Sequence, residues 1–141
     1  MLAEQRAYIH AFADGVGRAG YRAGIYCSGI PYHEPGGDIV ITADDIREHA
    51  GTRDLQFFIS NDHCGPSLGC VFPASAPLPS DSGVSFASVW QYAQSPRRPE
   101  MTAECRSTYA VDGSCYAPGM PGIYIDVESA TSSDPSAGRT K

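Results

Sequence analysis

The chain has 141 residues, enough for one domain with a core, and its 42% hydrophobic and 18% charged residues exclude wholesale disorder. Its net charge of −6 argues against non-specific binding to nucleic acid or to anionic membranes. No stretch approaches the ~20 apolar residues of a membrane span, and no signal peptide opens the chain. We therefore expect either a cytoplasmic protein or an extracytoplasmic one whose signal peptide lies upstream of Met1.

An amphipathic helix is predicted at the start of the chain. Ile9, Phe12, Ala13 and Val16 follow the i, i+3, i+4, i+7 spacing that places apolar side chains on one helix face. The spacing predicts a helix over residues 3–19 with one buried stripe.

Four strands and one short helix are expected after it. The strands are apolar almost throughout rather than alternating, which is typical of strands covered on both faces and favours a parallel α/β sheet. Thr42 is the expected cap of the short helix, with Asp45 three residues later. Proline and glycine mark the long connections as loops. The expected strands span residues 22–28, 54–62, 86–93 and 122–129, the helix spans 42–51, and the long loops span 62–86 and the segment through Cys115.

The cysteines favour disulfides over a metal site. Cys64 and Cys70 bracket one short loop, and Cys105 and Cys115 bracket another, which leaves Cys27 over as a small buried strand residue. Free thiols are the alternative. Zinc is disfavoured because no Cys-x-x-Cys occurs and the four histidines are scattered, so we expect no metal and no cofactor.

Four segments carry a family resemblance: "GYRAGIYCSG", "FFISND", "VWQYAQS" and "IYIDV". In this order they resemble the C-terminal half of the glycoside-hydrolase-like (β/α)8 domain of secreted bacterial proteins, which is related to the family-25 glycoside hydrolases (lysozyme-type muramidases). The resemblance implies an α/β fold, a partial (β/α)8 TIM barrel made of its last four parallel strands with long loops. It assigns residues 1–130 to the half-barrel and residues 131–141 to a flexible polar tail.

The resemblance implies that the chain recognises a polysaccharide or peptidoglycan. The sugar-cleaving carboxylates of the muramidase relatives lie on strands of the first half, so we expect this chain alone to be inactive. Four strands cannot close a barrel, and their exposed edges are expected to allow self-association. A non-catalytic carbohydrate-binding or interaction module is the alternative.

Asp126 is the carboxylate that the resemblance places in the pocket, as a catalytic or polarising group. Glu128 lies on the same face of the predicted strand, ~7 Å away. Two carboxylates from one strand lie side by side, whereas hydrolysis needs them on opposite sides of the glycosidic bond.

The expected substrate-binding residues are Trp90, Gln91, Tyr26 and Asn61. An aromatic ring stacks on the C–H face of a sugar, and an amide binds its hydroxyls. Alternation places Trp90 and Gln91 on opposite faces of their strand, so only one of them can face a barrel interior. Tyr26 and Asn61 lie near the ends of strands, where barrel sites are built. The alternatives are a buried tyrosine and a turn-forming asparagine.

Overall fold

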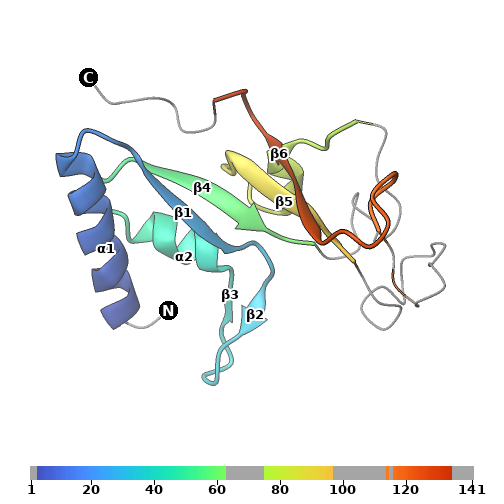
Figure 1. Ribbon diagram of the computed structural model, residues 1–141. Coiled ribbons are helices and arrows are strands. Elements are labelled where there is room, and N and C mark those ends of the chain that lie inside the picture. Colours follow the sequence, from blue (N-terminus) through green and yellow to red (C-terminus); the bar gives the residue numbers. More distant parts are fainter. Residues whose placement is uncertain (1–2, 63–74, 97–113, 115, 135–141) are drawn as a thin grey trace.

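The computed structural model describes residues 3–62, 75–96, 114 and 116–134. They form an α/β fold with two helices and a four-stranded sheet of mostly parallel strands (Figure 1). None of the described helices is long and apolar enough to cross a membrane. The cysteines of the predicted disulfides (Cys64, Cys70, Cys105 and Cys115) and the end of the predicted tail lie outside the described residues.

Helix α1 (Ala3–Arg18) confirms the predicted N-terminal helix. Gly20 lies two residues after its end, takes a positive φ of 81° and donates its N–H to the carbonyl of Gly17. The predicted buried stripe is only partly buried, because Ala13 is covered while Phe12 remains 42% exposed.

Polar contacts join α1 to helix α2 (Thr42–Glu48) and to the residues that follow it. The partners are spaced four residues apart on both segments, but only the first of them lies within α2 itself. The three contacts are the ion pair of Arg6 with Asp45, the His10 Nε2 contact to the His49 carbonyl at 2.7 Å, and the bidentate pair of Arg53 with Asp14 at 2.8 and 2.9 Å.

The sheet has the strand order β1–β4–β5–β6. Strands β1, β4 and β5 are parallel, but β6 runs antiparallel to β5, with a bulge between Gln91 and Ala93. The prediction of four parallel strands is therefore wrong for the last strand, and the described strands do not close a barrel. A parallel strand needs a crossover over the sheet, whereas an antiparallel neighbour needs only a reversal of the chain. The strands are β1 (Ala23–Ser28), β4 (Leu55–Ser60), β5 (Val89–Ser95) and β6 (Ile125–Ala130).

Three local features differ from the predictions. The segment between β1 and α2, where none of the four expected strands lies, contains a small antiparallel hairpin, β2 (Tyr32–His33) with β3 (Ile39–Val40). A short 3-10 helix, η1 (Pro79–Ser82), lies within the predicted loop 62–86. Thr42 is the first residue of α2 rather than its cap, and Ile41 occupies the cap position without a side-chain bond. Asp45, the expected third residue of the capping pattern, binds Arg6 instead.

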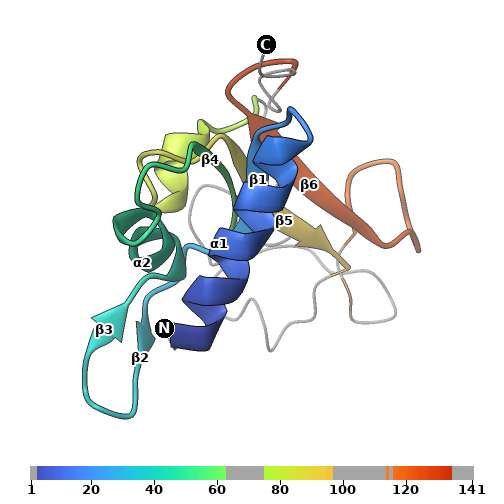
Figure 2. The ribbon, with the colours of Figure 1, turned by 90° about the vertical axis from the view of Figure 1, so that its left-hand side faces the viewer.

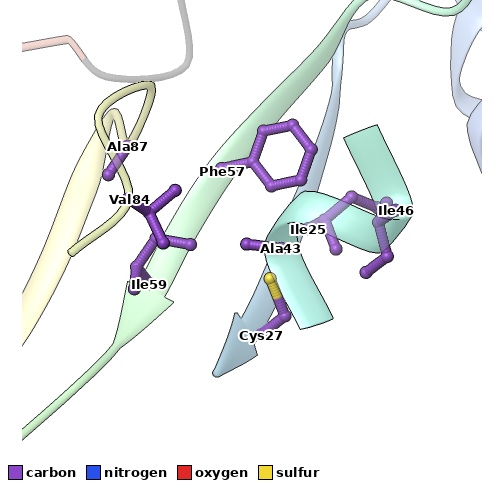
Figure 3. Packing of buried hydrophobic residues seen from close by; sticks show 8 residues of the cluster. All are labelled: Ile25, Cys27, Ala43, Ile46, Phe57, Ile59, Val84 and Ala87. Carbon is purple, nitrogen blue, oxygen red and sulfur yellow. The ribbon is translucent and has the colours of Figure 1, made fainter. Parts of the chain in front are cut away.

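The main core lies between α2 and one face of the sheet. Figure 3 shows side chains of β1 and β4 directed toward those of α2. Cys27 belongs to this cluster, which confirms it as a small buried strand residue. The members are Ile25, Cys27, Ala43, Ile46, Phe57, Ile59, Val84 and Ala87.

Candidate functional site

Strand alternation divides the sheet into two faces. We call the face covered by α2 the α2 face; it carries Ile25, Cys27, Phe57 and Ile59. We call the opposite face, which carries the residues between them, the Tyr26 face. Its members of interest are Tyr26 on β1, Phe58 on β4, Gln91 on β5, and Asp126 and Glu128 on β6.

Tyr26 and Gln91 meet on the Tyr26 face. The Tyr26 hydroxyl donates a hydrogen bond to Oε1 of Gln91 at 2.8 Å, although β4 separates their strands. Ser60 pairs with Gln91 in the register of β4 and β5, and its small side chain leaves room for the tyrosine to cross β4. The edge of the Tyr26 ring also packs on Phe58, with 4.9 Å between the ring centroids. Two of the four predicted substrate-binding residues are thus brought together.

The two carboxylates of β6 share this face. Glu128 pairs with Gln91 in the register of β5 and β6, and Asp126 pairs with Gln94 beyond the bulge. Directly paired residues of adjacent strands project to the same side, so both carboxylates lie on the side of Gln91. Both are exposed. The face therefore combines an exposed tyrosine ring, two exposed carboxylates and the buried Gln91 amide that anchors the tyrosine.

Trp90 lies on the other side of the sheet. It pairs with Ile59 of the α2 face, is only 2% exposed, and packs edge-on against Tyr92 at 5.8 Å between centroids. Its ring has no free face to offer a sugar, so the stacking predicted for it does not fit this position. Both rings serve packing instead, since Trp90, Tyr92 and Ala93 form a second small core against Val127.

Asn61 holds the end of β4 in place. Its side-chain Nδ2 donates to the carbonyl of Ser82 at 2.6 Å, and its own carbonyl accepts the indole N–H of Trp90 at 2.8 Å. Its backbone N–H donates to the carbonyl of Gln91 at 3.2 Å. These bonds assign Asn61 a structural role at the strand end.

No other catalytic group stands out in the part of the chain that the structure describes. Burial raises the pKa of the Cys27 thiol to about 12, with a smaller contribution from the charge of Asp44, so this thiol is a poor nucleophile at neutral pH. Burial also raises the pKa of Tyr92. The same described residues contain no cluster of three or more His, Cys, Asp or Glu side chains that could hold a metal ion.

Phe58 is the residue of this face that sequence reasoning missed. The pair "FF" in the second predicted strand places one ring on each face, and Phe58 is the one beside Tyr26. Alternation gave the signal, but it did not tell which of the two phenylalanines would lie under the helix.

No family model, curated protein or solved structure matches the chain.

Proposed function

We propose that the chain recognises a bacterial cell-wall polysaccharide, such as peptidoglycan, through the Tyr26 face. The single observation that carries the proposal is the hydrogen bond between the Tyr26 hydroxyl and Gln91 Oε1 at 2.8 Å. The bond holds the ring of the exposed Tyr26 in place. The Gln91 amide that accepts it is only 7% exposed, so the tyrosine ring and the two exposed carboxylates are the groups offered to a sugar. The resemblance to glycoside-hydrolase-like domains supplies the substrate class.

The chemistry of the face suits a sugar. The Tyr26 side chain is 59% exposed and leans on Phe58, so its ring is available to the C–H face of a pyranose. Carboxylates accept hydrogen bonds from hydroxyl groups, and Asp126 and Glu128 supply them on the same side of the sheet. In this proposal Asp126 orients and polarises a bound sugar rather than cleaving it.

We propose binding without hydrolysis for this chain by itself. A glycosidase places an acid and a second carboxylate on opposite sides of the scissile bond. Asp126 and Glu128 come from one strand and project from the same face, so they do not flank a bond between them. A reducing-sugar assay on peptidoglycan is expected to detect no release by this chain.

The half-barrel interpretation is part of the same proposal. Three parallel strands with α2 on one face and α1 beside it support a correspondence with successive βα units of a (β/α)8 barrel. The Tyr26 face would then be the interior face. The antiparallel β6 is the departure from that pattern.

The test is co-sedimentation with purified insoluble peptidoglycan. Tyr26→Ala removes both the stacking ring and the hydroxyl, and Glu128→Ala removes a carboxylate without touching the Tyr26–Gln91 bond. Each is expected to weaken binding by about tenfold, the effect of ~1.4 kcal/mol of lost contact energy. Tyr124→Ala is the matched control, because that tyrosine is 79% exposed on a loop before β6.

Three outcomes would reject the proposal: no binding by the wild type, equal loss in the Tyr124→Ala control, or binding that both face variants retain. The alternative is an interaction module for another protein, which predicts that a folded wild-type chain does not sediment with the polysaccharide. Release of reducing sugar by the chain would contradict only the proposal that it does not hydrolyse the polysaccharide, and would leave the proposal that it binds.

A further inference from the structure

Strand β1 lies at the edge of the sheet that the described residues form. It is the terminal strand of the sheet, with β4 as its single neighbour among the described strands. The N–H of Gly29 donates to the carbonyl of Ser60 at the end of β4. By alternation, Ala23, Ile25 and Cys27 also direct their backbone N–H and C=O groups toward β4. The backbone N–H and C=O groups of the residues between them, Gly24, Tyr26 and Ser28, therefore point away from the sheet.

A groove of about 580 Å³ runs between this edge and α1. Figure 2 shows α1 in front of β1. Side chains from one side of α1 form most of the helix wall of the groove. One of them is Phe12, which is 42% exposed. A Cβ atom built on Gly24 meets nothing within 4 Å, so space begins at the strand itself. The main lining residues are Tyr8, Ile9 and Phe12 of α1 and Gly24, Tyr26 and Cys27 of β1.

We infer that this groove takes one extended peptide strand of another polypeptide, added to the edge of β1 beneath α1. The outward backbone groups of β1, which no described strand pairs with, favour a partner that offers its own backbone, and an added strand satisfies them. The apolar wall of α1 specifies apolar side chains at every second position of that strand. Glu4 is the one charged side chain in the described lining, so a basic residue is favoured opposite it.

A second copy of this chain fits the groove less well. If two copies paired through their β1 edges, the two strands would lie ~4.8 Å apart. Each copy would also bring its own α1 to that edge, and two packed helices need ~8–10 Å between their axes, so the helices would crowd each other. The net charge of −6 also opposes close approach of two copies. The self-association predicted from the sequence is therefore the competing outcome, to be separated by measurement.

The experiment selects binders from a phage-displayed random library of peptides of about ten residues, long enough for one strand, on the immobilised full chain. Enriched peptides are expected to alternate apolar and polar residues and to carry a lysine or arginine. A chosen peptide is then resynthesised in two forms. One form carries methyl groups on the backbone nitrogens of its odd-numbered residues, and the other carries them on those of its even-numbered residues. Methylation of the set facing β1 should weaken binding by about tenfold or more, whereas methylation of the other set should not.

Variants of the chain test whether the peptide binds in the groove. Phe12→Lys adds a charge to the α1 wall, and Gly24→Pro removes an outward N–H from an edge strand, where proline is tolerated. Both should lose the peptide, with circular dichroism confirming the fold. Leu78→Lys is the control, because Leu78 is also an exposed apolar residue but lies outside the groove lining.

The results separate the alternatives. No enrichment, peptides without a period of two, equal binding to Phe12→Lys, or indifference to the methylated set would each overturn the inference. A wild-type dimer in sedimentation that Phe12→Lys dissociates would assign the groove to a second copy instead. None of these results depends on polysaccharide binding, so the two proposals fail separately.

Discussion

The indole Nε1 of Trp90 donates a hydrogen bond to the backbone carbonyl of Asn61 at 2.8 Å. This bond joins the buried ring of β5 to the residue that follows β4. Asn61 returns a bond to β5 through its own N–H, which donates to the carbonyl of Gln91. The position of Gln91 on the Tyr26 face therefore depends on the packing of Trp90 on the opposite face.

Trp90→Phe is expected to destabilise the chain by about 2–4 kcal/mol, because it opens a cavity and leaves the Asn61 carbonyl without its indole donor. Chemical denaturation followed by tyrosine fluorescence and circular dichroism measures this. Tyr124→Phe, a change at an exposed position, is the control and should stay within about 0.5 kcal/mol of the wild type. A Trp90→Phe variant as stable as that control would mean that the ring is not buried as described.

Gly29→Ala is expected to destabilise the chain by about 1–3 kcal/mol. A Cβ at this position would lie 2.6 Å from Cγ2 of Ile59 and 3.3 Å from the carbonyl of Ser82, so the core beside η1 would have to move. Gly24→Ala makes the same change in the adjoining strand, where a Cβ meets nothing within 4 Å. Thermal melts that rank these two variants in the opposite order would contradict the close packing at Gly29.

The ion pair between α1 and α2 predicts a specific acid dependence. The hydrogen bond from Arg6, followed by its charge, lowers the pKa of Asp45 below its usual range despite the opposing effect of burial. A carboxylate with a lowered folded pKa stabilises above its unfolded pKa of ~3.9 and loses that contribution as pH falls through the folded pKa.

Asp45→Asn should therefore be less stable than the wild type at neutral pH, and the difference should shrink as the pH falls below about 4. Denaturation midpoints measured across that range test this. Asp44→Asn makes the same charge change at an exposed position of α2 and should show a smaller difference at neutral pH. A wild-type advantage over Asp45→Asn that grows as the pH falls below about 4 would have the wrong sign.

Cys27 is expected to resist alkylation in the folded chain. Its pKa of about 12 and its place in the core leave almost no accessible thiolate at pH 8. Mass spectrometry after iodoacetamide treatment should find Cys27 unmodified in the native protein and modified in urea. Rapid native labelling at Cys27 would show that the core beneath α2 opens readily.

Local patterns predicted the first elements well. The apolar spacing located α1, and the apolar runs located β1 and β4 to within about two residues of their observed ends. These features depend on contacts near in sequence or on simple burial. The same runs carry no information on strand direction, so the antiparallel β6 could not be foreseen from its residues.

The candidate site was predicted only in part for a related reason. Alternation correctly separated Trp90 from Gln91, but which of them faces the core depends on where α2 packs. The Tyr26–Gln91 bond spans 65 residues and crosses β4, so its existence required the strand order and register. Asn61 was singled out for its place at a strand end, and that place explains its structural bonds equally well.

The most direct measurement of the central claim is a titration of the isotope-labelled chain with soluble peptidoglycan fragments, followed by nuclear magnetic resonance. The account predicts saturable shifts at Tyr26, Gln91 and Glu128, while Ala43 and Ile46 of α2 stay unchanged. Shifts confined to α2, or none at all at millimolar fragment concentrations, would contradict recognition through the Tyr26 face.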